Sequence, residues 1–213
     1  MKAKKALILA PHTDDGEFGC GGTIAKLLRN GCDVWYVAFS KCEDSLPKGW
    51  AKDTLVKEVM AATNVLGIKS SQVMVKNYKV RHFPENRQEI LDDLIELRKN
   101  INPDVVFMPS IHDIHQDHST IAYEGLRAFK NITIFSYEVP WNNFTFRNQA
   151  FVEISEDDAN IKISALKKYE SQYGRAYATE DVIRSILRVH GMQVGKKYAE
   201  VYEIPRMVLG EKI

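Results

Sequence analysis

The sequence lacks the features that would send it to a membrane or to nucleic acid. Its 213 residues contain no apolar run approaching the roughly 20 residues that a membrane helix needs. Lys and Arg together number 29, against 28 Asp and Glu, so there is no excess charge of one sign to attract a polyanion. We therefore expect no membrane span and no nucleic-acid partner.

Cysteine is also scarce. The three cysteines, Cys20, Cys32 and Cys42, make an odd number without framework spacing, which argues against a disulfide scaffold and favours a reducing compartment. The opening MKAKKALILA is basic and then apolar, but the run is too short for a secretory signal and no small-residue cleavage site follows. The expected location is the cytoplasm, and the apolar run is expected to be a buried strand.

The length and composition favour one globular domain spanning residues 1–213. Hydrophobic residues make up 45% and charged residues 27%, both ordinary for a folded protein, and no linker rich in Gly, Pro or Ser divides the chain. Parallel-sheet domains of this size often assemble, so the sequence allows a homo-oligomer while identifying no interface for it.

Short β-rich runs alternate with helical patterns through the first two thirds of the chain. Expected strands are 5–10, 33–40, 72–76, 104–109 and 133–138, and expected helices begin near 21, 52, 84 and 117. Such alternation needs right-handed crossovers between parallel strands, which predicts a doubly wound, mostly parallel α/β sheet sandwiched by helices, as in Rossmann-like folds. The weaker later pattern predicts a strand at 146–154, helices at 156–171 and 179–190, and a closing strand at 198–209.

Two clusters of potential metal ligands follow predicted strands. The first cluster comprises His12, Asp14 and Asp15, and the second comprises His112, Asp113, His115, Asp117 and His118. In a doubly wound sheet of order 3-2-1-4-5, the binding crevice lies between the carboxyl ends of strands one and four. We therefore expect the two clusters to meet, although about a hundred residues separate them.

Two histidines and one carboxylate from these clusters match a catalytic zinc site, in which three protein ligands leave a fourth position open. Zinc lowers the pKa of water to about 7, and a neighbouring carboxylate can then accept its proton. Taken singly, each cluster has a plainer interpretation: the first as a polar loop whose Asp caps the next helix, and the second as a helix start with Asp117 as N-cap. Their predicted convergence favours the metal site.

The residues also resemble a known family, the PIG-L/LmbE-like N-acetylglucosaminyl deacetylases. Ala10-Pro11-His12-Thr13-Asp14-Asp15, with glycines at 19, 21 and 22, is similar to that family's first signature, and His115-Gln116-Asp117-His118 is similar to its second. Ser171-Gln172 and Tyr198-Ala199-Glu200 resemble later family features, so the likeness spans nearly the whole chain.

The resemblance implies a role for each matching residue. His12, Asp15 and His118 would hold Zn²⁺, or another divalent metal such as Fe²⁺. Asp14 would be the general base, His115 would stabilise the oxyanion as an imidazolium, and Asp117 would stand behind the ligands. Thr13 replaces the usual proline, and Gly16 stands where the family has glutamate, with Glu17 one place later; the role borrowed for that glutamate is therefore in doubt.

Loops after the second, third and fifth strands should open on the same crevice. The substrate contacts expected from these loops are Ser40, Lys41, Arg81, Tyr137, Trp141 and Asn142. Trp141 could equally pack the domain surface or form a subunit contact.

The expected function is zinc-dependent removal of an N-acetyl group from a small-molecule amino sugar or sugar conjugate. The alternatives are hydrolysis of another acylated amine or of a phosphoester. Phosphoester hydrolysis would be expected to need a second metal or an Arg/Lys clamp. A dinucleotide-binding module is disfavoured, because Gly19 and Gly21 lack the third glycine of the fingerprint and lie too far past the first strand.

Overall fold

A computed structural model describes residues 3–209, which contain one seven-stranded sheet in the order β3-β2-β1-β4-β5-β7-β6. β1 to β5 are parallel, and β7 joins β5 and β6 in antiparallel fashion. The strands are β1 (Lys5–Ala10), β2 (Asp33–Ala38), β3 (Val73–Val75), β4 (Val105–Pro109), β5 (Thr133–Tyr137), β6 (Ala150–Glu153) and β7 (Ala199–Arg206). The predicted mostly parallel α/β sheet and its 3-2-1-4-5 order are confirmed.

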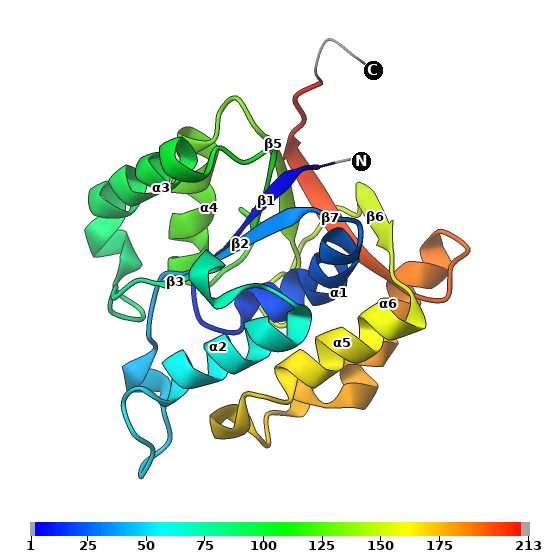
Figure 1. Cartoon of the computed structure of the whole chain (residues 1–213), viewed down its shortest axis with the longest axis horizontal. Helices are drawn as coiled ribbons and strands as arrows, with labels where there is room; N and C mark the ends of the chain where they lie inside the picture. The colour runs from blue at the N-terminus through cyan, green and yellow to red at the C-terminus, as the bar shows by residue number, and fades with distance from the viewer. Residues whose placement is uncertain (1–2, 210–213) are drawn as a thin grey trace.

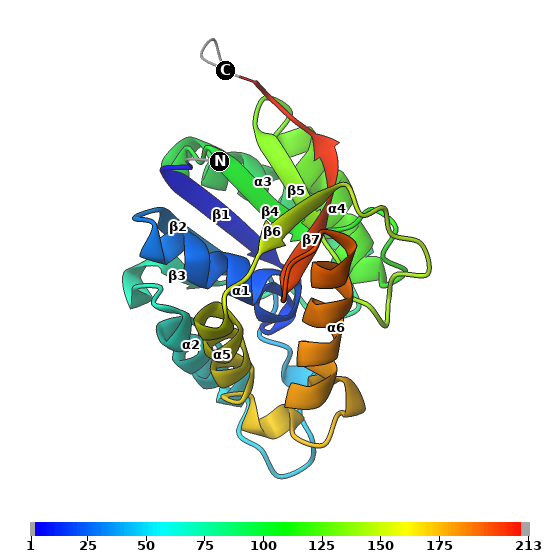
Figure 2. The same cartoon turned by 90° about the vertical axis from the view of Figure 1, so that its right-hand side faces the viewer.

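Helices cover both faces of the sheet (Figures 1 and 2). One face carries α1 (Asp15–Arg29), α2 (Thr54–Leu66), α5 (Glu156–Leu166) and α6 (Glu180–Gln193); the other carries α3 (Arg87–Ile101) and α4 (Gln116–Ala128). Alternate residues of β1 divide between the two cores, with Ile8 in the core beneath α1 and α2 and Leu7 in the core beneath α3 and α4. The apolar run at 5–10 is thus a central strand buried on both faces.

Some predicted boundaries were wrong. The first helix begins at Asp15, six residues before the predicted start, and it contains a break at Cys20, where φ is −146°. The helix predicted to reach residue 171 ends at Leu166, and short 3-10 turns at Glu170–Gln172 and Ala176–Ala178 follow it. The strand predicted at 146–154 is confined to β6, because residues 146–149 lie outside the ladder.

The break in α1 is held by a buried ion pair from distant elements. The Glu200 carboxylate accepts hydrogen bonds from the backbone N–H groups of Gly22 and Thr23, at 3.0 and 2.7 Å, and so caps the second half of the helix. The Lys162 ammonium lies 2.6 Å from Glu200 and donates to the carbonyl of Phe18 at 2.6 Å. The first turn of α1, which carries Asp15, is therefore a separate short segment anchored by α5 and β7.

The parallel strands present their carboxyl ends at one edge of the sheet, where the β1–α1 and β4–α4 loops meet. None of the helices within residues 3–209 has the length and apolar character needed to cross a membrane.

Candidate metal centre and active site

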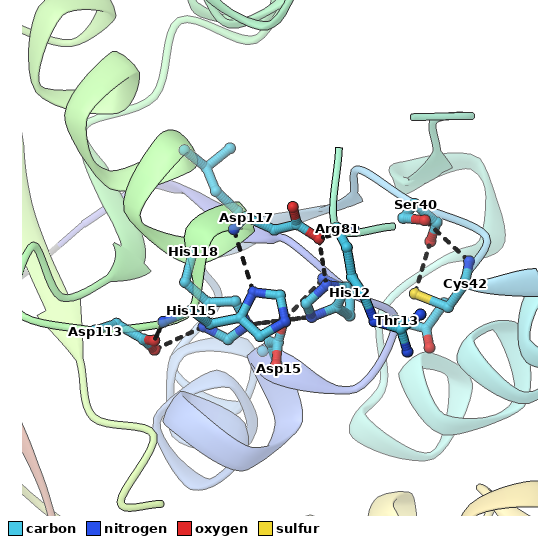
Figure 3. Close-up of polar contacts among 12 residues, drawn as sticks. His12, Thr13, Asp15, Ser40, Cys42, Arg81, Asp113, His115, Asp117 and His118 are labelled. Atoms are coloured by element: carbon cyan, nitrogen blue, oxygen red, sulfur yellow. Dashed lines mark hydrogen bonds and ion pairs between the residues drawn. The ribbon is translucent and has the colours of Figure 1, made fainter. Parts of the chain in front are cut away.

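The two predicted ligand clusters come together at this edge, as Figure 3 shows. His12 lies on the β1–α1 connection and Asp15 is the first residue of α1, whereas His115 and His118 lie at the start of α4. His12 Nδ1 is 3.1 Å from His118 Nε2, across 106 positions of sequence. The spatial assumption behind the metal-site prediction therefore holds.

Three potential metal-ligand atoms form a nearly equilateral triangle. Asp15 Oδ2 lies 3.1 Å from His12 Nδ1 and 3.2 Å from His118 Nε2, and the two nitrogens are 3.1 Å apart. Tetrahedral zinc with bonds of about 2.0–2.1 Å places its ligands roughly 3.4 Å apart. The triangle matches that spacing with an open fourth side.

Carboxylates behind the two imidazoles decide which nitrogens face the triangle. His118 Nδ1 lies 2.7 Å from Asp113, and His12 Nε2 lies 3.0 Å from Asp117. A carboxylate can only accept, so these nitrogens carry the protons and the opposite nitrogens present lone pairs to the triangle. This carboxylate–histidine arrangement is typical of metal ligands, because it fixes ring orientation and tautomer.

The triangle thus consists of three acceptors facing one another, an arrangement that attracts a cation or a proton. Burial would lower the pKa of His118, but Asp15 and Asp113 raise it to about 10; for His12, Asp15 and Asp117 likewise outweigh burial and raise the pKa to about 8. Burial would raise the pKa of Asp15, yet the two histidines lower it well below its usual value. Both the geometry and the charge of these residues fit a divalent cation.

His115 offers an alternative third ligand. Ligand nitrogens of His12, His115 and His118 all lie within 4.8 Å of one another, which is wider than the triangle that includes Asp15. His115 is the N-cap of α4, and its Nδ1 accepts the N–H of Asp117 at 3.2 Å, which leaves only Nε2 for a ligand or a proton.

The family resemblance implies that the His115 ring is protonated on both nitrogens, whereas its contacts in the structure indicate a neutral ring. Burial and the charges of His12 and His118 lower the pKa of His115 to about 4, and its Nδ1 is already an acceptor. The ring is therefore neutral and carries its proton on Nε2, from which it can still donate one hydrogen bond.

Asp117 is fully buried and links three parts of the site. Its carboxylate accepts from His12 and from the backbone N–H groups of Arg81, at 2.6 Å, and Phe83, at 3.3 Å. The interpretation of Asp117 as N-cap of the helix was wrong, since His115 occupies that position and Asp117 lies inside α4.

Asp14 stands beside the triangle and lines the cavity in front of it. Burial and the neighbouring Asp15 raise its pKa to about 6, while His12 and Arg175 act in the opposite direction. A carboxylate with its pKa raised toward neutrality is suited to accept and return a proton.

The cavity in front of the triangle has a volume of about 320 Å³. Among the predicted substrate contacts, Arg81, Trp141 and Asn142 line it. Ser40 and Lys41 line a neighbouring hollow instead, together with Cys42 and residues 77–80, and the Ser40 hydroxyl accepts the N–H of Cys42.

Tyr137 was placed wrongly by the sequence argument. The side chain is fully buried, its hydroxyl donates to the carbonyl of Leu9 at 2.9 Å, and its ring packs against Gly19. The last residue of a strand can point to either face, and here it points into the core.

Several cavity residues were not predicted. Gln172, Arg175 and Tyr177 come from the irregular segment after α5. Behind the cavity lining, Asp113, which orients His118, was noted in its cluster without a role. Ser171-Gln172 had been noticed only as a resemblance. A stronger signal for Asp113 was its place five residues before His118, on the same loop.

Glu17 supports the loop that carries His12. Its buried carboxylate contacts the hydroxyls of Tyr36 and Tyr169, the latter at 2.9 Å, and both hydroxyls also approach the carbonyl of Thr13, at 2.9 and 2.7 Å. Burial raises the pKa of Glu17 to about 8. The glutamate displaced by one position thus has an internal role behind the ligand loop.

Known proteins share both sequence and fold with this chain. Diacetylchitobiose deacetylase of Thermococcus kodakarensis is 25% identical over 221 residues, which cover 92% of this chain and 81% of the relative. The structure of N,N'-diacetylchitobiose deacetylase from Pyrococcus horikoshii aligns with a TM-score of 0.79 at 25% identity, over 95% of this chain and 84% of that one.

The fold by itself does not fix the reaction. The 4-carboxy-2-hydroxymuconate hydratase GalB of Pseudomonas putida aligns with a TM-score of 0.78 over 99% of both chains, but at 18% identity it shares the fold alone. The family model that matches residues 7–129, more than half of the chain, is PIG-L, described as GlcNAc-PI de-N-acetylase. The matched region contains both ligand loops, and the chain belongs to the PIG-L family of de-N-acetylases.

Proposed function

We propose that this protein is a zinc-dependent hydrolase that removes the N-acetyl group from an amino sugar or sugar conjugate. The observation that carries the proposal is the triangle of Asp15, His12 and His118 donors at 3.1–3.2 Å, with Asp14 beside it at the floor of a cavity. Named deacetylases among the relatives support the amide substrate.

His12, Asp15 and His118 would hold the ion. When bound, zinc supplies Lewis acidity, which lowers the pKa of water at the site and polarises a carbonyl group. Another divalent metal such as Fe²⁺ would suit the same nitrogen and oxygen ligands. We assign His115 a role beside the ion and not as a ligand, because the group of three histidine nitrogens is wider than the triangle that includes Asp15.

Two side chains beside the triangle, Asp14 and His115, act on the reacting atoms. Asp14 accepts a proton from water as the water oxygen forms its bond to the acetyl carbon. His115 donates a hydrogen bond from Nε2 to the carbonyl oxygen as that oxygen gains negative charge. Asp14 then returns the proton to the departing nitrogen as the C–N bond breaks, which yields acetate and a free amine.

The test is metal analysis of the purified protein together with acetate release from a panel of N-acetylated sugars. The panel includes N-acetylglucosamine, diacetylchitobiose and nucleotide-linked and lipid-linked conjugates, with a phosphomonoester as the alternative substrate. We expect about one zinc per chain and acetate from at least one sugar. Metal-loaded protein that releases acetate from none of them, or that releases phosphate instead, would overturn the proposal.

A further inference from the structure

A second, larger cavity adjoins the metal-site cavity. It has a volume of about 590 Å³ and lies along the segment between α5 and α6, from Leu166 to Glu180. Four residues, Asp14, Gln172, Arg175 and Tyr177, line both cavities. The proposed general base therefore stands at the boundary, and a molecule bound at the triangle can extend into the second space.

The lining of the second cavity is mostly aromatic and aliphatic. Its uncharged side chains include Phe18, Leu166, Tyr169, Tyr173, Ala176, Tyr177 and Ala178. The Tyr173 ring is 96% exposed and lines this cavity, so that it is accessible to a bound molecule. Tyrosines combine a flat apolar face with a hydroxyl, which suits a pyranose ring with its C–H face and polar rim.

The charges in this cavity largely neutralise one another. Lys167 pairs with Glu180 at 2.8 Å, and Arg175 donates to the hydroxyl of Tyr177. The remaining charged linings are one cation, Arg175, and two acids, Asp14 and Glu170. The cavity thus offers no excess of positive charge to a phosphate or carboxylate, and an uncharged group fits it better.

The wall between the cavities is held in place before any ligand arrives. The Tyr177 ring stacks on Trp141 with centroids 3.9 Å apart and planes 20° apart. Behind the segment, Glu58 of α2 accepts the N–H and the hydroxyl of Ser171, at 2.8 and 2.6 Å, and Tyr169 donates to Thr13 of the ligand loop. A preformed wall reduces the entropy lost on binding.

From this geometry we propose that the second cavity binds an uncharged second sugar unit, so that the substrate is an N-acetylated disaccharide or larger glycoside. This inference rests on the proposed function. The metal-site cavity of about 320 Å³ lies at the small end of the range of ligand pockets and suits one ring. The next ring would stack against Tyr173 and Tyr177.

The first experiment compares kcat/KM for diacetylchitobiose with kcat/KM for N-acetylglucosamine in the zinc-loaded protein. We expect the disaccharide-to-monosaccharide ratio to exceed one and to fall about fivefold to tenfold in Tyr173→Ala, as loss of one aromatic contact implies. The control is Phe144→Ala; Phe144 is 83% exposed and lines neither cavity, so its ratio should stay at the wild-type value. An unchanged ratio in Tyr173→Ala would overturn the proposal.

A binding measurement separates this proposal from the proposed function. Calorimetric titration of zinc-loaded Asp14→Asn with diacetylchitobiose should show tighter binding than with N-acetylglucosamine, and adding Tyr173→Ala should remove the difference. Disaccharide binding without acetate release from any sugar in the wild type would support the second cavity while refuting the deacetylase activity. Acetate release with equal preference for one and two sugars, or stronger preference for N-acetylglucosamine 1-phosphate, would refute the inference alone.

Discussion

Asp14 and Asp15 are adjacent in sequence but have opposite electrostatic surroundings. Two histidines hold the pKa of Asp15 well below its usual value even though burial opposes them, whereas burial and Asp15 raise the pKa of Asp14 to about 6. From the sequence, the roles of metal ligand for Asp15 and general base for Asp14 could be assigned only through the family resemblance. The distances to His12 and His118 support Asp15 as the ligand on physical grounds.

Replacing Asp14 by Asn should separate metal binding from turnover. The amide keeps the shape of the side chain but cannot accept a proton, so we expect kcat to fall by roughly 10²- to 10⁴-fold while zinc content stays unchanged. Acetate assays and metal analysis on the same preparation measure both. Asp92→Asn, on the exposed side of α3, serves as the control; loss of zinc in Asp14→Asn would make Asp14 a ligand.

Glu17 is satisfied by hydrogen bonding in a way that glutamine can imitate. Four oxygen–oxygen contacts join Glu17, Tyr36, Tyr169 and Thr13, and the two tyrosine hydroxyls supply two hydrogens for them. A protonated Glu17 supplies one more, so that three of the four contacts are hydrogen bonds at any one time. Glu17→Gln should change the free energy of unfolding by under about 1 kcal/mol, and Glu17→Ala should lower it by about 1–3 kcal/mol. Urea denaturation of both variants tests this, and equal losses would refute the hydrogen count.

At the level of elements, the sequence predicted what local patterns determine. The apolar runs at 5–10 and 104–109 became β1 and β4, and the sheet order placed their loops together. The start of α1 was missed because the glycines of this helix weaken the helical pattern. The cap after its break comes from Glu200, 178 residues from Gly22. The cavity wall at 172–177 was missed for a similar reason, since Glu58 and Tyr169 hold it by side-chain contacts instead of a repeating pattern.

The break in α1 should depend on the Lys162–Glu200 pair. Both side chains are buried, so Glu200→Leu would leave the ammonium without its partner and should lower the free energy of unfolding by about 3–5 kcal/mol. Chemical denaturation measures the loss. In Lys162→Met/Glu200→Leu the cost should be smaller than in Glu200→Leu alone, whereas additive losses would show that the two charges act independently.

The start of α5 should make the protein acid-sensitive. Burial would raise the pKa of Asp158, but Arg29 and the capping Ser155 lower it below its usual value of 3.8. A lowered pKa in the folded state means that stability is present above about pH 4 and is lost as pH falls through the folded pKa. Asp158→Asn should lower the free energy of unfolding at pH 7 and make it depend less steeply on pH between about pH 4 and pH 2. Urea denaturation at each pH measures this free energy. Equal slopes of free energy against pH in the wild type and the variant would contradict the prediction.

Across the whole molecule, an ion at the triangle would join the two halves of the parallel sheet. His12 and Asp15 follow β1, and His118 follows β4, so a cation that binds only the folded chain stabilises it by mass action. At 100 times its Kd, zinc should raise Tm by roughly 5–10 °C, and a chelator should reverse the rise. Calorimetry with and without chelator measures the shift. His118→Ala is the control, and a shift of the same size in that variant would place the stabilising ion elsewhere.

The Asp117 carboxylate has one further consequence. Because the same group orients the His12 imidazole and accepts the N–H of Arg81, whose φ of 70° is rare outside glycine, the ring and the β3–α3 connection share one anchor. We therefore expect a sugar that shifts Arg81 to change the affinity of the His12 site for a cation. Thermodynamic reciprocity requires the cation to change affinity for that sugar by the same factor.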